Sequence, residues 1–268
     1  KKTLVKTDLL LEGVHFDLTY VPLKHLGYKS AVVNFSDIYA MNGQPKQITV
    51  SIGLSKRFSV EDLDEFYSGI LLACEVYGVD LVGGDTSSSR TGLTISITCI
   101  GEADDDRIVY RSGAKETDLV CVSGDLGAAY MVLQLLEREK NVFKGEKDFS
   151  PDFAGKEYLL ERQLRPEARK DIIEILSKAN ILPTAMMDVS DGLSSELIHI
   201  TKQSRVGCRI YEERIPIDYQ TAMMAEQFHM NLVTAALIGG EVYELLFTVP
   251  LALHEQIESM EGIKIIGH

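Results

Sequence analysis

Five aspartates, placed at predicted strand ends, beside glycine or on a helix, are the residues of this chain with the clearest chemical potential. They are Asp8, Asp37, Asp85, Asp188 and Asp191. Each alone has a plainer explanation, because aspartate often caps a helix or shapes a turn. Converging carboxylates repel one another unless cations lie between them, and Mg²⁺ takes oxygen ligands together with substrate phosphates. The set therefore predicts Mg²⁺-dependent phosphoryl transfer.

The stretch MMDVSDGLSSEL, residues 186–197, concentrates this pattern. An apolar run that reads as a buried strand comes before it, and a helix is predicted after it. One residue suffices to cap a helix, yet Asp188, Ser190 and Asp191 all stand at this turn. The backbone N–H groups that begin a helix also favour phosphate oxygens. We expect this turn to hold metal and nucleotide together.

Motifs typical of other enzyme classes are absent from the sequence. It contains no G-x-x-x-x-G-K-[ST] phosphate loop, no G-x-G-x-x-G turn and no zinc-type Cys/His spacing. No histidine accompanies a G-x-S-x-G element, so a hydrolase triad has no support. The carboxylates remain the main chemical signal.

Composition narrows the range of partners. The 268 residues are 45% hydrophobic and carry a formal net charge of −13. This charge argues against nucleic acid or an anionic membrane, because phosphate backbones require Lys and Arg. No apolar run approaches the length of a transmembrane helix. The four cysteines form no C-x-x-C pair and are predicted to be buried free thiols of a cytoplasmic protein: Cys74, Cys99, Cys121 and Cys208.

The elements that must position these residues alternate along the chain. Strands are predicted at 2–11, 47–54, 79–86, 92–103, 118–124, 206–211, 242–250 and 262–268, and the strand at 79–86, VDLVGGDT, is expected to be buried. Helices are predicted at 22–43, 59–78, 127–140, 167–179 and 193–203. Alternation in both halves indicates an α/β or α+β protein with two domains, 1–110 and 111–268.

Six motifs follow the order and spacing of thiamine-monophosphate kinases, and the chain resembles that family over essentially its whole length. They are TDLLLEGVHF, NFSDIYAMNG, LVGGDT, YRSGAK, MMDVSDGL and GGEVYELL. The family belongs to the superfamily of aminoimidazole ribonucleotide synthetase and selenophosphate synthetase. EGVHF, and DVSDGL paired with GGE-YELL, are more specific to the kinases than GGDT, which is shared more widely.

The resemblance implies an activity and an architecture. The expected reaction is ATP-dependent phosphorylation of thiamine monophosphate to thiamine diphosphate, the last step in making that cofactor. The implied fold is the two-domain aminoimidazole ribonucleotide synthetase-like architecture. Its N-terminal domain binds metal and ATP and pairs its sheet in a homodimer, and its C-terminal domain is an α/β sandwich. The nucleotide is expected in a cleft lined by both domains.

The resemblance also implies site residues. The implied Mg²⁺ ligands are Thr7, Asp8, Asp37, Asp85, Asp188 and Asp191. The implied ATP contacts are Gly84, Asp85, Arg111 and Ser190. The implied substrate contacts are His15 and Glu241. No general base or covalent nucleophile is expected, because the attacking oxygen belongs to the substrate's phosphate and is already anionic at neutral pH.

The sequence departs from the family pattern in four places. The acidic G-D-D segment that normally comes before the first strand is missing, and we expect it in a piece of the protein ahead of Lys1. Lys6 stands where a small hydroxyl residue is usual. Val242 replaces an expected aspartate beside the substrate glutamate. The family's C-terminal aromatic residue is not found before His268.

Two other functions stay open. One is a sibling enzyme of the superfamily that acts on formylglycinamidine ribonucleotide, although EGVHF and GGE-YELL speak against it. The other is a non-catalytic relative that binds nucleotide or thiamine phosphate. Val242 and the missing G-D-D segment are the departures that suggest it.

Overall fold

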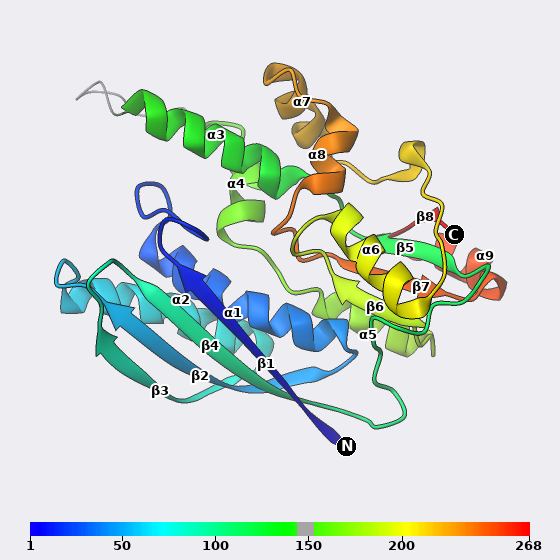
Figure 1. The fold of residues 1–268 in the computed structure, drawn as a ribbon, viewed down its shortest axis with the longest axis horizontal. Coiled ribbons are helices and arrows are strands. Elements are labelled where there is room, and N and C mark those ends of the chain that lie inside the picture. The colour runs from blue at the N-terminus through cyan, green and yellow to red at the C-terminus, as the bar shows by residue number, and fades with distance from the viewer. Residues whose placement is uncertain (144–152) are drawn as a thin grey trace. The chain divides into compact units, whose positions relative to one another are not determined.

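The computed structural model describes residues 1–143 and 153–268, which form two compact units (Figure 1). The first unit contains residues 1–106 and 164–168, and the second contains 107–163 and 169–268. The fold is mixed α/β, as predicted, with one four-stranded sheet in each unit. Nothing in the sequence pattern indicates that residues 164–168 return to the first unit.

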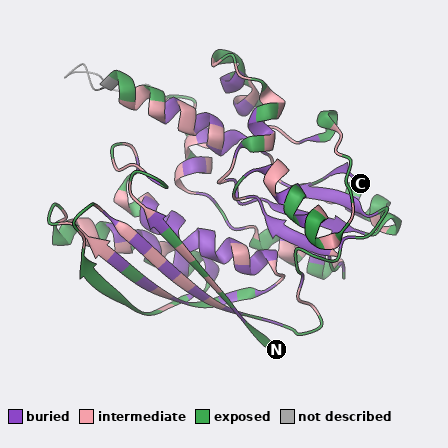
Figure 2. Ribbon diagram, in the orientation of Figure 1, coloured by how far each residue is buried: buried purple, intermediate pink, exposed green. Residues whose placement is uncertain are grey.

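The first sheet has the strand order β1-β4-β2-β3. Its strands are β1 (Lys2–Leu11), β4 (Thr94–Ala103), β2 (Gln44–Leu54) and β3 (Asp80–Ser88). The pairings are antiparallel except for β2 with β3, which run parallel. Buried and partly buried residues alternate along β4 (Figure 2), as expected for a strand with one face against a core.

Two helices cover one face of the first sheet. Helix α1 (Leu23–Ala40) packs against β1, β2 and β4, and α2 (Val60–Tyr77) packs against α1. Helix α1 contacts both the sheet and α2, and most of its residues are buried. The predicted start of α2 is confirmed, since Ser59 and Asp62 form a capping box. Gly78, with φ of +69°, ends the helix.

Strand β3 lies at the edge of the first sheet and is exposed along almost its full length. The prediction of a buried strand here was wrong. The apolar letters of VDLVGGDT suggested burial, but β3 is an edge strand, α1 packs mainly against the other three strands, and α2 contacts β3 without covering it. Val82 is consequently 52% exposed.

The second sheet has the strand order β6-β7-β5-β8, with every pairing antiparallel. Its strands are β6 (Ala185–Asp188), β7 (Leu245–Val249), β5 (Leu119–Ser123) and β8 (Ile263–Gly267). Every residue of β5, β6 and β7 is buried. The hydrophobic core around them includes Val122, Val189 and Leu246.

The remaining helices lie between residue 128 and residue 258. They are α3 (Ala128–Phe143), α4 (Glu157–Leu164), α5 (Lys170–Lys178), α6 (Leu193–Ser204), α7 (Tyr219–Gln227), α8 (Leu232–Ile238) and α9 (His254–Glu258). Two 3₁₀ turns complete the set, η1 (Glu212–Arg214) and η2 (Leu251–Leu253). None of the helices in the described ranges is both long and apolar enough to cross a membrane.

Two strand predictions need correction. The predicted strand at 206–211 was wrong, because the pairing of this segment is limited to the bridge from Ile210 to Gly267 and the backbone hydrogen bonds beside it. The strand predicted from residue 242 begins at Leu245. Glu241 and Tyr243 have φ of +59° and +57°, which no extended strand can accommodate.

The cysteines are free, but they are not all buried. Cys74, Cys99 and Cys121 are buried as predicted, whereas Cys208 is exposed. Cys208 lies in the segment that does not form the predicted strand.

Candidate active site

Asp8 and Asp37 are brought together in the first unit, with the Lys6 ammonium group between them. Lys6 and Asp8 lie on the same face of β1 as buried Leu4 and Leu10, which is the face that α1 covers. Asp37 belongs to α1. Lys6 Nζ lies 3.2 Å from Asp8 Oδ1 and 2.9 Å from Asp37 Oδ2. Burial alone would lower the pKa of Lys6, but Asp37 and Asp8 raise it above its ordinary value. Position 6 therefore carries a positive charge at neutral pH.

Thr7 lies on the opposite face of β1 from Asp8, because side chains alternate along a strand. Its Oγ1 donates to the Ile97 carbonyl at 3.2 Å and accepts from Thr98 Oγ1 at 3.1 Å. The structure thus separates the Thr7 hydroxyl from the Asp8 and Asp37 carboxylates. Its assignment as a metal ligand stays a prediction.

Asp85 is remote from Asp8 within the first unit. The register aligns Asp8 with Ile97, Ile97 with Val50, and Val50 with Gly84, so three strand spacings separate β1 from β3. At about 4.8 Å for each spacing, this is about 14 Å. Asp85 is also exposed and follows Gly84 by one residue, so alternation turns it to the face opposite Asp8. One copy of this unit does not bring these two carboxylates together.

Gly84 allows the backbones of β2 and β3 to approach closely. A Cβ atom at this position would lie 1.9 Å from the Val50 carbonyl oxygen. Any side chain would therefore push β3 away from β2. This packing requirement accounts for one glycine of the GGDT motif without reference to a ligand.

The EGVHF loop is fixed by Glu12, a residue that the sequence reasoning did not single out. Glu12 accepts from the Leu93 backbone N–H at 2.8 Å and forms an ion pair with Arg57. Burial raises its pKa, but these contacts outweigh burial and hold the pKa below its usual value. Within the loop, His15 Nδ1 accepts from the Leu11 N–H at 3.0 Å, which leaves the ring proton on Nε2. His15 is exposed, and the loop that carries it is held in place by these hydrogen bonds.

The two most specific motifs lie side by side in the second unit. The loop after β6 pairs with the loop before β7 through backbone hydrogen bonds. Glu241 N–H donates to the Ser190 carbonyl at 2.7 Å, and Tyr243 N–H donates to the Val189 carbonyl at 2.9 Å. A Cβ atom on Gly240 would lie 2.4 Å from the Ser190 carbonyl oxygen, so the close approach requires glycine. The structure thus places Ser190 beside the predicted substrate residue Glu241.

The predicted acids do not cap helix α6. Its N-cap is Gly192, with φ of +119° and no side-chain cap. Instead Glu196, in the first turn, accepts from the Asp191 N–H at 2.8 Å. Burial raises the pKa of Glu196 above its usual value. Asp191 is exposed and Asp188 is buried at the end of β6, so capping does not account for either carboxylate.

Glu241 is held in an unusual backbone conformation that directs its side chain. Its φ of +59° lies in the left-handed region, which non-glycine residues seldom adopt. Its Oε2 accepts from Gln163 Nε2 at 2.7 Å. The neighbouring Val242 is 1% exposed and belongs to the hydrophobic core. Its side chain therefore packs into the core and does not lie beside Glu241. Valine in place of the expected aspartate thus does not remove a side chain that would contact the Glu241 carboxylate.

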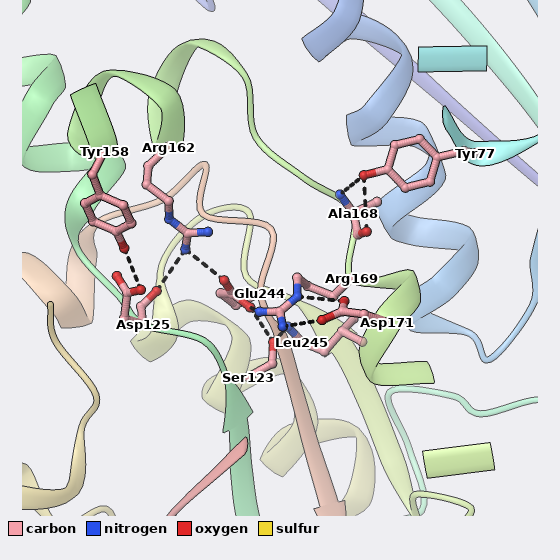
Figure 3. A network of polar contacts seen from close by, with 10 residues as sticks. All are labelled: Tyr77, Ser123, Asp125, Tyr158, Arg162, Ala168, Arg169, Asp171, Glu244 and Leu245. Atoms are coloured by element: carbon pink, nitrogen blue, oxygen red, sulfur yellow. Dashed lines mark hydrogen bonds and ion pairs between the residues drawn. The ribbon is translucent and has the colours of Figure 1, made fainter. Parts of the chain in front are cut away.

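Glu244, the second glutamate of GGEVYELL, is the centre of a buried polar network that the sequence analysis missed (Figure 3). Its carboxylate forms ion pairs with Arg162, at 2.8 Å, and with Arg169, and it accepts from Ser123 Oγ. Burial acts to lower the pKa of Arg162, but Glu244 raises it above its usual value. Gly124 has φ of +54°, and a Cβ atom there would lie 2.2 Å from Glu244 Oε1, so any side chain at this position would displace the Glu244 carboxylate.

This network extends to two further aspartates. Arg169 binds Asp171 with two nitrogens, at 2.9 and 2.7 Å. Arg162 Nη2 donates to the Asp125 carbonyl at 3.0 Å, and Tyr158 donates to Asp125 Oδ2 at 2.5 Å. Arg169 and Asp171 are two residues apart, but the other partners lie 33 to 121 residues apart in sequence, which explains why no local pattern revealed the network.

Arg111, a predicted ATP contact, is exposed on the segment that leads into β5. Among the described residues it has no hydrogen bond or ion pair. Its guanidinium therefore has no protein partner in this part of the chain, and it is free to meet an anion.

The donor set suits a hard divalent cation only in part. Within residues 1–143 and 153–268, no group of three or more His, Cys, Asp or Glu side chains is arranged to hold a metal ion. Mg²⁺ is commonly bound by one or two carboxylates, with water and substrate phosphates as its other ligands. The Asp8–Asp37 pair offers such oxygens, and so does the Asp188–Asp191 turn.

Comparison with known proteins gives consistent results. Residues 1–103 match the family described as AIR synthase related protein, N-terminal domain. The thiamine-monophosphate kinase of Aquifex aeolicus is 38% identical over 276 residues, covering 100% of this chain and 85% of that protein. The Bacillus subtilis thiamine-monophosphate kinase is 35% identical over 246 residues, covering 92% and 72%. A solved structure of AaThiL complexed with AMPPCP and TMP has a TM-score of 0.87 at 36% identity, covering 99% of this chain and 80% of that one.

Proposed function

The chain belongs to the thiamine-monophosphate kinase family, and we propose that it transfers the γ-phosphoryl group of ATP to thiamine monophosphate. One observation carries the proposal. The fold matches over 99% of its length a relative whose structure was solved with AMPPCP and TMP. The products are thiamine diphosphate and ADP, and the chain is an enzyme of the phosphotransferase class.

The proposed chemistry is a direct in-line displacement. An anionic oxygen of the substrate phosphate attacks the γ-phosphorus of ATP, and the bond from that phosphorus to the bridging oxygen of ADP breaks. No proton has to be removed from the nucleophile, so no general base is needed. The protein contributes by positioning the two substrates and by neutralising their charge.

Two carboxylate pairs are proposed as Mg²⁺ ligands, Asp8 with Asp37 in the first unit and Asp188 with Asp191 in the second. Bound Mg²⁺ would neutralise phosphate charge during transfer. Their oxygens are of the hard type that Mg²⁺ prefers, and the second pair is not occupied in capping α6. We also retain Asp85 and Thr7 as proposed ligands, although both lie on the other face of the first sheet.

Nucleotide and substrate contacts are proposed at exposed and partly buried positions of β3 and of several loops. Ser190 and the N-terminus of α6 are suited to phosphate oxygens, and Arg111 supplies a guanidinium that has no partner among the residues described. Gly84 and Asp85 complete the proposed ATP contacts. For the thiamine moiety, we propose His15, which presents a ring N–H, and Glu241, which Gln163 orients.

A homodimer is proposed through the sheets of the first unit. In the described part of the chain, β1 and β3 each pair with a single strand. Asp8 and Asp85 lie about 14 Å apart on opposite faces, so a second copy is the simplest means of supplying both to one nucleotide. Size-exclusion chromatography with light scattering would test the stoichiometry. We also propose a cytoplasmic location, because all four cysteines are free.

The function is tested by measuring thiamine diphosphate directly. Purified chain is incubated with ATP, thiamine monophosphate and Mg²⁺, and the products are separated by chromatography. We expect thiamine diphosphate and ADP in equal amounts, with none when EDTA is added. Release of ADP at the full rate without thiamine monophosphate, or a phosphorylated side chain during turnover, would contradict direct transfer.

The same material separates the alternatives. A non-catalytic relative would bind ATP and thiamine monophosphate in calorimetry but form no thiamine diphosphate at saturating Mg²⁺. A sibling enzyme would release ADP only with formylglycinamidine ribonucleotide in a substrate panel. Burial of Val242 in the core weakens the case for a degenerate binder, because that position does not present its side chain beside Glu241.

A further inference from the structure

The Asp8–Asp37 pair already has a cation, supplied by the protein itself. Lys6 Nζ lies within 3.2 Å of both carboxylates. All three side chains are partly shielded, with exposed fractions of 31% for Lys6, 30% for Asp8 and 21% for Asp37. The contact joins a strand residue to a helix residue across the face of β1 that α1 covers. It is therefore part of the packing of this unit and differs from a fully exposed surface ion pair.

An ammonium group and a metal ion cannot both occupy the space between these oxygens. The lysine ammonium has three donors and no lone pair, so it cannot serve as a metal ligand. A small hydroxyl residue, which the family resemblance leads one to expect at position 6, has acceptor lone pairs and no charge. The lysine of this chain thus changes both the charge and the coordination chemistry at this pair.

We propose that the Lys6 ammonium takes the place of one divalent cation at the Asp8–Asp37 pair. This chain then binds one metal ion fewer than a variant with a neutral residue at position 6. The inference rests on the proposed function in taking Asp8 and Asp37 as oxygens that face Mg²⁺, and it limits that assignment: Lys6 fills the cation position between them, so the pair contributes to Mg²⁺ only through an ion that the substrate phosphates also hold. The two carboxylates and the ammonium group together keep one unit of negative charge. This charge can be balanced by a cation that the substrate carries, or it is solvated by water. The competing behaviour is that the flexible lysine stem swings away and the metal binds both aspartates.

Counting bound Mn²⁺, a paramagnetic probe for Mg²⁺, tests the proposal without substrate or turnover. Free Mn²⁺ is measured by electron paramagnetic resonance during titration of wild type, Lys6→Ser, Lys6→Met and Lys6→Arg at neutral pH. We expect both neutral variants to bind one additional Mn²⁺ per chain, at least about tenfold more tightly than wild type does at that position. This is the order expected when a unit positive charge beside a divalent ion is removed in a partly hydrated site. Lys6→Arg should match wild type.

A second substitution locates the additional ion. Adding Asp37→Asn to Lys6→Ser should abolish it, because the pair is then reduced to a single carboxylate. Circular dichroism establishes that each variant is folded, and Lys6→Met keeps most of the apolar stem in case Lys6→Ser is not folded. Equal Mn²⁺ counts in wild type and the folded neutral variants, with affinities that differ less than tenfold, would overturn the proposal. So would an additional ion that survives Asp37→Asn.

Failure of this inference and failure of the proposed function are distinguishable. Expected Mn²⁺ counts without formation of thiamine diphosphate would refute the kinase activity alone. Formation of thiamine diphosphate with unchanged counts would refute the role of Lys6 alone.

Discussion

Removal of the negative charge of Glu244 should destabilise the second unit far more than its single atom change suggests. The carboxylate is 1% exposed and lies between Arg162 and Arg169, with Ser123 donating to it. Glu244→Gln keeps the size of the side chain. It leaves two largely buried guanidinium groups without a counter-charge and turns an amide N–H group toward donors.

The magnitude follows from how deeply these groups are buried. Loss of one partner from a buried ion pair costs about 3–5 kcal/mol, because the remaining charge stays buried and uncompensated. Both arginine side chains retain 15% exposure, so water offsets part of this cost and the lower figure, about 3 kcal/mol, applies. For a unit of this size, 1 kcal/mol changes Tm by about 2–4 °C, which gives a loss of about 6–12 °C.

Differential scanning calorimetry measures this loss directly. The matched control is Glu258→Gln, the same substitution at a glutamate whose side chain is 59% exposed. It should change Tm by no more than about 2 °C. Replacing Arg169 with Met in the Glu244→Gln background should destabilise less than the sum of the single changes, because fewer unpaired charges remain. A Glu244→Gln variant that melts within 2 °C of wild type would refute the reasoning.

Three further outcomes are expected. Asp191→Asn should lower the rate of thiamine diphosphate formation at least about 100-fold, whereas Asp64→Asn, on the exposed side of α2, should not; equal rates for both would remove Asp191 from the metal ligands. Burial raises the pKa of Glu196, so wild type should lose stability as pH rises from about 4.5 through the raised value. Urea titrations should show Glu196→Gln gaining stability relative to wild type over that range, and a constant difference would count against this. Ellman's reagent should titrate one thiol per native chain, Cys208, and four after denaturation; a second fast thiol would contradict the burial described above.

Local features of the first unit were predictable because neighbours in sequence create them. The capping box joins Ser59 to Asp62 within the first turn of α2. The left-handed Gly78 hydrogen-bonds to the Cys74 carbonyl in its last turn. The alternation along β1 likewise follows from the period of a strand. The same local logic reached too far at residues 206–211, because only the end of this segment meets β8, through the bridge from Ile210 to Gly267 and a few backbone hydrogen bonds.

The positions of the aspartates and the spacing of the motifs, read from the sequence alone, were enough to predict the family, the phosphoryl-transfer chemistry and the candidate carboxylates. Strand order, which depends on packing between distant segments, placed Asp8 and Asp85 at opposite edges of one sheet. Only tertiary structure revealed that Lys6 lies between Asp8 and Asp37, because the contact joins a strand to a helix. It also revealed Glu244 as a buried hub, since its partners lie 75 to 121 residues away. Residue types set which chemistry is possible, and the packing of the chain decides which of those groups meet.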